Sequence, residues 1–223
     1  MKRIFLLAAS AFLALAGDLS AATLNGKVMF LTKRGQKPVV NETLVWLEPL
    51  DAKAPKRPAG AFQMATRSKT FVPHVVAVPA GSTIAFPNED PISHNLFSLS
   101  PGNTFDLGLY RKGAGKTEKF ETPGVVNIYC NVHPNMSAVV HVMPTPYYGF
   151  TDANGNYSFD VPAGRYRVVA WNEQSGQTSS DVEIAASGVK GSTLLTLDSR
   201  NFRAQQHSNK EGKPYQKPST KDY

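Results

Sequence analysis

Short apolar segments separated by turns of Pro, Gly and Asn make up most of the chain between residues 23 and 198. Tyr157, Phe159 and Val161 alternate with polar residues, and the same pattern returns after the turn at residues 162–164. An alternation of period two is typical of strands with one buried face and one wet face. The sequence shows no repeat and no long helical pattern, so we predict an all-β protein made of sandwiches.

The other predicted strands are rich in β-branched and aromatic residues and are bounded by turn residues. They cover residues 26–31, 42–49, 71–78, 82–88, 125–130, 137–143, 181–187 and 192–197. The composition agrees with this prediction, because 16 Pro and 17 Gly supply many turns.

The N-terminus predicts export from the cytoplasm. Lys2 and Arg3 precede an apolar run over residues 4–16, and small residues follow up to Ala22. This order is typical of a signal peptide, which we place at residues 1–22, and the run is shorter than the roughly 20 residues of a membrane span. We therefore expect a periplasmic or secreted protein that does not span the membrane.

Positive charge is concentrated at the C-terminal end. Residues 199–223 contain six Lys or Arg and two acidic residues, out of a net charge of +7 for the chain. This segment is polar and poor in large apolar residues, so we predict a basic disordered tail. It could contact the anionic cell envelope by charge, and nucleic acid is not an expected partner in this compartment.

The chain's single cysteine lies in the stretch YCNVHPNM, residues 129–136. Cys130, His133 and Met136 are separated by two-residue gaps, and His94 follows an upstream strand that could deliver it to the same point. One thiolate, two imidazoles and one thioether suit a trigonal copper site with a weak axial methionine. Zinc prefers a carboxylate or water to a thioether as its fourth ligand.

Other interpretations of these residues are possible. Cys130 could be a small buried hydrophobe, or could form a nucleophile pair with His133, although no oxyanion hole or orienting group is evident. The chain has no His-x-His pair for a multicopper centre, so we do not expect an enzyme. We interpret the remaining polar residues as background: His74 and His141 as satisfied or surface-facing, His207 as part of the tail, and Glu89 and Asp90 as solvated.

Residues 71–143 resemble a cupredoxin of the plastocyanin and amicyanin type, of the kind often labelled methylamine utilization protein. The segment TFVPHVVAVPAGSTIAFPN resembles the family's opening strands, and the short C-x-x-H-P-x-M spacing resembles amicyanin. The resemblance implies a Greek-key sandwich holding one type 1 copper. It implies that His94 and His133 bind through Nδ1, Cys130 through its thiolate, and Met136 axially.

The same resemblance implies a function and a partner. Asn95 would hold the two ligand segments together by hydrogen bonding near the cysteine loop, although an Asn at a strand end is often only a turn residue. The protein would carry single electrons, and redox partners such as a cytochrome c or a dehydrogenase would dock near Val132, Pro134 and Asn135. The alternative is a periplasmic copper-binding or storage protein, or an envelope-binding protein, without electron transfer.

The two flanking segments resemble halves of one carboxypeptidase regulatory-like (transthyretin-like) β-sandwich. Neither half has enough strands to bury a core alone. We therefore predict a discontinuous sandwich of residues 23–50 plus 146–198, a linker at 51–60 and an inserted cupredoxin domain at 61–145. The simpler alternative is an N-terminal extension of the cupredoxin followed by an independent module.

Overall fold

The computed structural model describes residues 21–204 and 206–215. In this part of the chain the protein is all-β, with strands β1 to β18 and a single 3-10 turn, η1 (Val40–Glu42). No helix there is long and apolar enough to cross a membrane. The predicted signal peptide lies outside the described residues except for Ala21 and Ala22, which begin β1 (Ala21–Leu31).

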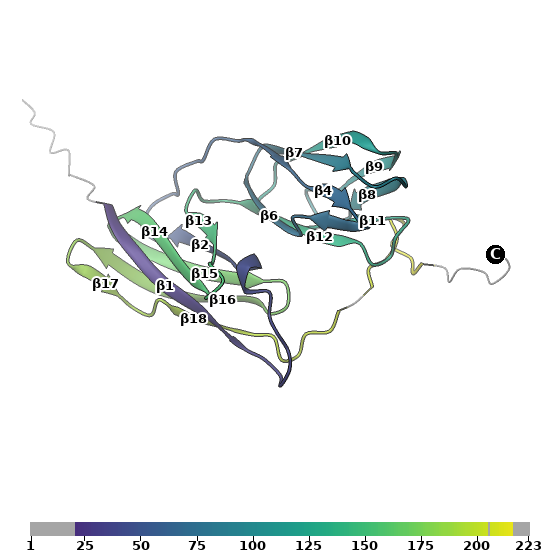
Figure 1. The fold of residues 1–223 in the computed structure, drawn as a ribbon. Coiled ribbons are helices and arrows are strands. Elements are labelled where there is room, and N and C mark those ends of the chain that lie inside the picture. Colours follow the sequence, from purple (N-terminus) through teal and green to yellow (C-terminus); the bar gives the residue numbers. More distant parts are fainter. Residues whose placement is uncertain (1–20, 205, 216–223) are drawn as a thin grey trace, which may run out of the picture.

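The first sandwich is built from both ends of the chain (Figure 1). Its small sheet has the order β14-β1-β18, and its large sheet has the order β13-β2-β15-β16-β17. The strands are β2 (Leu44–Pro49), β13 (Tyr148–Phe150), β14 (Asn156–Pro162), β15 (Gly164–Asn172), β16 (Gly176–Ala185), β17 (Gly188–Lys190) and β18 (Leu194–Asp198). Thus β1 and β2 pair with strands that lie beyond residue 145, which is the pairing that the split-domain hypothesis requires.

The second sandwich lies between these halves in sequence. Residues 51–60 contain no strand and lead to sheets of order β10-β7-β4-β5, with β3 on β7, and β6-β12-β11-β8-β9. The strands are β3 (Ala61–Gln63), β4 (Ala65–Arg67), β5 (Thr70–Val72), β6 (Val75–Pro79), β7 (Ser82–Asn88), β8 (His94–Ser98), β9 (Phe105–Tyr110), β10 (Gly113–Phe120), β11 (Gly124–Cys130) and β12 (Ser137–Met143).

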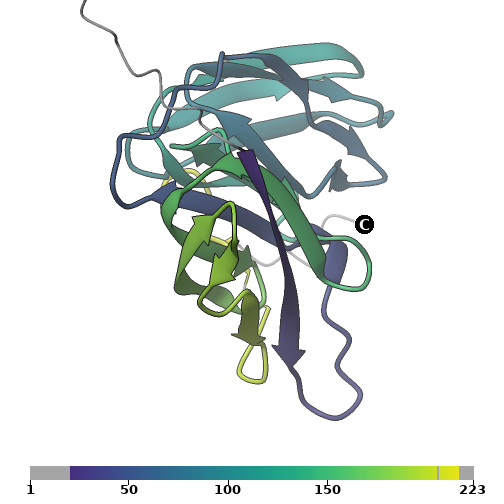
Figure 2. The ribbon, with the colours of Figure 1, turned by 90° about the vertical axis from the view of Figure 1, so that its left-hand side faces the viewer.

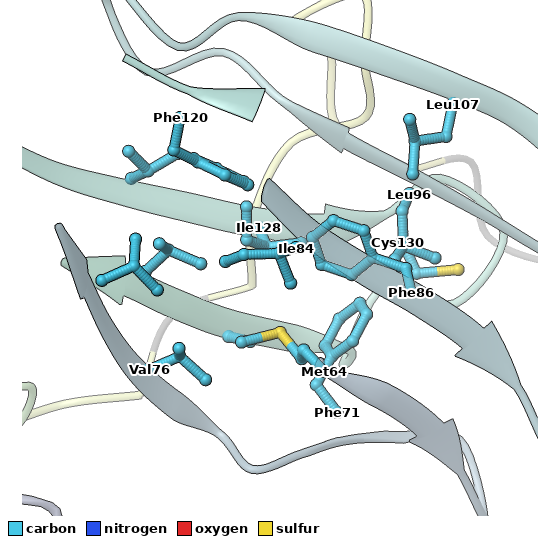
Figure 3. Close-up of a cluster of buried hydrophobic side chains, with 14 of the residues drawn as sticks. Met64, Phe71, Val76, Ile84, Phe86, Leu96, Leu107, Phe120, Ile128 and Cys130 are labelled. Atoms are coloured by element: carbon cyan, nitrogen blue, oxygen red, sulfur yellow. The ribbon is translucent and has the colours of Figure 1, made fainter. Parts of the chain in front are cut away.

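The core of this second sandwich contains the cysteine. Apolar side chains from both sheets meet between them, including Ile84 and Phe86 from β7 and Ile128 from β11. Figure 3 shows Cys130 in this cluster together with Leu96 and Phe86. Burial of these side chains is the main force that holds the two sheets together, so the cysteine is fixed by a packed core.

The two sandwiches are stacked face to face (Figure 2). A third cluster of buried apolar side chains lies between them. On β12, Val140 faces the core of the second sandwich, whereas Val139 belongs to the cluster between the sandwiches. On β15, Val168 faces the core of the first sandwich, whereas Val169 belongs to the same cluster between them. Four strands are therefore buried on both faces along part of their length. We expected one wet face on β15, which is wrong at Val169 and Trp171, because the inserted sandwich covers that face.

The two histidines near this interface have opposite environments. The Nε2–H of His74 donates a 2.6 Å hydrogen bond to the Glu173 carboxylate, which raises the pKa of His74, as expected for a satisfied residue. His141 is not satisfied, contrary to our interpretation: it is 4% exposed, its ring packs edge-on against Trp171 at 4.2 Å, and its Nε2 has no partner among the described residues. Burial lowers the pKa of His141 to about 4.

The segment after β18 also differs from the prediction. We expected disorder throughout residues 199–223, but residues 206–215 lie against the cysteine loop, and Figure 1 shows the yellow segment reaching the second sandwich. Two features explain the difference: His207 and Tyr215 supply aromatic surface, and Lys210 pairs with Asp106 at 2.8 Å. Residues 205 and 216–223 lie outside the described part, and contact of this tail with the cell envelope stays a prediction.

The buried state of His141 predicts a pH-dependent stability. In the unfolded chain His141 is protonated below its ordinary pKa of about 6.5, whereas in the folded protein it is protonated only below about pH 4. The free energy of unfolding should therefore fall as the pH drops from 6.5 to 4, by at most about 3 kcal/mol from this residue.

His141→Phe should weaken this dependence, which urea denaturation at pH 7 and pH 4.5 would measure. His74 titrates with the opposite sign, because its folded pKa is raised, but it is present in both proteins and cancels in the comparison. An identical pH dependence in the two proteins would contradict the prediction.

Candidate metal centre

Strand pairing brings two residues together that are 36 positions apart in the sequence. His94 is the first residue of β8 and Cys130 is the last residue of β11, and the two strands pair at Cys130 with Leu96 and Tyr129 with Phe97. One more backbone hydrogen bond, 2.8 Å from the Asn131 N–H to the Asn95 carbonyl, continues the pairing beyond the strand. The imidazole of His94 is thereby held beside the thiol.

The ligand loop, residues 130–136, turns back over this pair. The Met136 N–H donates to the His133 carbonyl at 3.0 Å, which closes a turn with Pro134 and Asn135 at its centre. The Cys130 N–H donates to the Met136 carbonyl at 3.2 Å and closes the base of the loop. The predicted sharp return of the chain therefore occurs, and it points His133 toward Cys130.

Three of the four predicted ligands converge. The Cys130 Sγ lies 3.7 Å from Nδ1 of His94 and 3.5 Å from Nδ1 of His133, and the three donor atoms lie within 4.8 Å of one another. Three donors placed at 120° around a metal, with bonds of about 2.1 Å, are roughly 3.6 Å apart. The spacing therefore fits a trigonal metal site formed by one sulfur and two nitrogens.

Met136 is placed less fully than the other three. Its side chain is 2% exposed and belongs to the same apolar cluster as Cys130. A buried thioether next to the ligand loop is compatible with weak axial binding, which is the arrangement of blue-copper sites. The assignment of Met136 as the axial ligand stays a prediction.

Asp90 contacts the candidate site, which the sequence interpretation did not predict. We took Glu89 and Asp90 for solvated turn residues, and this is right for Glu89, which is exposed and pairs with Arg67 at 2.6 Å. Asp90 is 7% exposed, and its Oδ2 lies 2.9 Å from Nε2 of His94. Its position four residues before His94 is the only sequence signal, and that signal alone is weak.

The charge of Asp90 determines which nitrogen of His94 is free. Burial raises the pKa of Asp90, but hydrogen bonds from the Lys69 N–H, from His94 and from the Ser68 N–H outweigh it and leave the pKa below its ordinary value. An ionised carboxylate can only accept, so Nε2 of His94 carries the proton. In the neutral imidazole the unprotonated nitrogen is then Nδ1, which faces Cys130 at 3.7 Å, and this tautomer is the one that can bind a metal there.

Asn95 links the ligand segments differently from the expectation. We expected its side chain to bond near the cysteine loop, but its Nδ2 donates to Asp106 on β9 at 2.6 Å. The bond to the loop is made by the Asn95 backbone carbonyl, which accepts from Asn131. Any residue can supply a carbonyl, so the link to the loop does not depend on the identity of Asn95.

His133 is the donor residue nearest to solvent. His94 and Cys130 are fully buried, whereas His133 is partly exposed and follows Val132, which is 46% exposed. Burial lowers the pKa of His133. A lowered pKa favours the neutral imidazole, which is the metal-binding form.

Comparison with known proteins gives a relative for part of the chain. Amicyanin-alpha of Methylorubrum extorquens is 30% identical over 88 residues, which are 38% of this chain and 74% of that protein. No family model matches the chain.

Solved structures also match part of the chain, at lower identity. A purple cupredoxin from Nitrosopumilus maritimus is 24% identical with a TM-score of 0.31, covering 36% of this chain and 98% of its own. The Cu(I) form of an amicyanin mutant is 17% identical with a TM-score of 0.36, covering 44% of this chain and 99% of its own.

The contact between Asp90 and His94 predicts a loss of metal affinity in Asp90→Asn. The amide is neutral and cannot accept from His94 and from both backbone N–H groups, so His94 loses its fixed orientation. We expect copper affinity to fall roughly 10- to 100-fold, measured by competition with a chelator of known affinity. Glu89→Gln is the matched control, because it neutralises the adjacent exposed carboxylate; equal affinities in the two variants would contradict the role of Asp90.

Proposed function

Because this chain belongs to the cupredoxins of the amicyanin type, we propose that it carries single electrons on one type 1 copper in the periplasm or outside the cell. The observation that supports this proposal is the convergence of His94, Cys130 and His133 at the spacing of a trigonal site. Export rests on the N-terminal sequence pattern. No bond chemistry is assigned to the protein.

The protein's own residues would supply a rigid and mostly dry site. Bound copper would gain and lose one electron. Cys130 and His94 are fully buried in the packed sandwich. Asp90 holds the His94 ring by its hydrogen bond to Nε2, the nitrogen that faces away from Cys130. The donor set is intermediate between the preferences of Cu(I) and Cu(II). A site that cannot rearrange between these preferences keeps the structural change on electron transfer small.

Access for a partner would be through the ligand loop. His133 is the partly exposed donor, and the apolar Val132 next to it is 46% exposed. We place the docking surface at Val132, Pro134 and Asn135, where apolar contact would bring a partner within reach of the His133 ring. The partner would be another redox protein, such as a cytochrome c or a dehydrogenase.

The proposal predicts an intense visible absorption band when one equivalent of Cu(II) is added to the full mature protein. The band arises from charge transfer between the Cys130 thiolate and copper, and it should bleach on reduction and return on reoxidation. Cys130→Ser should abolish the band because it removes the thiolate. A colourless copper complex of the parent protein would contradict the electron-transfer function and favour storage or binding without redox chemistry.

The predicted role of Met136 can be separated from its role in packing. Met64 and Met136 are both buried thioethers of the same core cluster, and replacing either with Ala should cost roughly 2 to 5 kcal/mol of stability. If Met136 is the axial ligand, only Met136→Ala should change the reduction potential and the visible spectrum. Voltammetry and absorption spectra of both variants would measure this, and equal values in the two would exclude axial ligation by Met136.

A further inference from the structure

The C-terminal segment at residues 206–215 contacts the ligand loop from outside the cupredoxin sheets. It follows β18 of the first sandwich and ends beside β11 of the second (Figure 1). It contains no regular strand. Individual hydrogen bonds and ring contacts attach it to the second sandwich, and not sheet pairing. We name it the strap.

The strap's last described residue bonds to the backbone of the cysteine. Tyr215 donates its hydroxyl hydrogen to the carbonyl oxygen of Cys130 at 2.8 Å. The N–H of Cys130 already donates to the Met136 carbonyl within the loop. Both backbone groups of Cys130 therefore have partners, one from the loop and one from the strap.

Aromatic contacts attach the two ends of the strap. The ring of His207 lies on the ring of Tyr129 with a centroid separation of 4.3 Å and an angle of 17°. Tyr215 meets His207 edge-on at 5.3 Å. Tyr129 directly precedes Cys130, so the stack lies on the strand end that presents the thiol.

Lys210 joins the strap to both ligand segments. Its backbone N–H donates to the Asn131 side chain at 2.9 Å, and its Nζ pairs with Asp106 Oδ2 at 2.8 Å. The other oxygen of Asp106 accepts from the Asn95 side chain, next to His94. Burial raises the pKa of Asp106, but the bonds from Lys210, Asn95 and the Gly108 N–H outweigh it, so this carboxylate stays charged.

We propose that residues 206–215 are a positioning strap, which holds the Cys130–Met136 loop in its metal-binding form before metal arrives and tunes the loaded site. The loop's own backbone bonds, at Cys130 and Met136, close the turn but leave the Cys130 carbonyl and the Asn131 side chain free for Tyr215 and Lys210. A tail that only rests on the surface would not satisfy a backbone group of the cysteine. The tuning part of this proposal rests on the proposed copper site.

The first test uses the metal-free full chain. Amide hydrogen exchange reports local opening, and the Asn131 and Met136 amides are both hydrogen-bonded in the ligand loop. Replacing His207, Lys210 and Tyr215 together with Ala should speed exchange at these amides by at least about tenfold, since each lost contact is worth roughly two- to tenfold.

Tyr215→Phe is the second variant, because it removes the hydroxyl and keeps the ring. It should speed exchange at the same amides by roughly two- to tenfold. Tyr166→Phe is its matched control: the Tyr166 hydroxyl donates to the Pro162 carbonyl at 2.9 Å in the other sandwich. Exchange in the ligand loop that stays at the parent rate in both strap variants would overturn the proposal.

The copper-loaded proteins test the tuning. The reduction potential and the visible band should shift in Tyr215→Phe and stay at the parent values in Tyr166→Phe, which a purely structural loss of stability would not produce. An unchanged potential in Tyr215→Phe would overturn the tuning part. If the parent chain forms no coloured copper complex, the proposed function fails, whereas the exchange rates of the metal-free loop still decide whether the strap positions it.

Discussion

The pairing of β8 with β11 is the constraint on which the site depends. It places His94 beside Cys130 across 36 residues of sequence, and the bond from Asn131 to the Asn95 carbonyl extends it into the ligand loop. A two-residue turn centred on Pro134 and Asn135 then suffices to add His133. Because a sheet register is set by the buried face of every strand in it, the whole core maintains the spacing of three donor atoms.

Strands that are buried on both faces join the two sandwiches. On β6 and β12, alternate residues face the cupredoxin core and the cluster between the sandwiches, and on β2 and β15 they face the first core and that same cluster. An inserted domain usually has a polar surface and a mobile linkage. Here its outer sheet is covered by another sheet, and the strap from the far end of the chain provides a second attachment.

Much of the fold, and the three donor residues that the structure brings together, could be predicted from the sequence, because strand patterns and the spacing of the cysteine loop are local. Period-two alternation and turn residues located the strands, and the spacing of Cys130, His133 and Met136 located the ligand loop. What could not be predicted depends on tertiary contacts. In the sequence Asp90 cannot be told from any other turn carboxylate, because its contact with His94 forms only in the fold.

The predictions for His141 and for the tail were wrong for the same reason. Nothing in the strand around His141 signals that two tryptophans from the other sandwich enclose its ring. The basic composition of residues 199–223 predicts disorder, and it conceals the few residues that anchor the strap. The site that His207 and Tyr215 contact is assembled from the fold, so their role has no sequence motif.

The most direct test of the central claim is X-ray absorption at the copper edge on the full chain loaded with one equivalent of copper. We expect two imidazole nitrogens and one short sulfur contact around the copper, from His94, His133 and Cys130. The sulfur contribution should disappear in Cys130→Ser. Nitrogen and oxygen ligands alone in the parent protein would contradict the proposed site, because the cysteine would then not bind the metal.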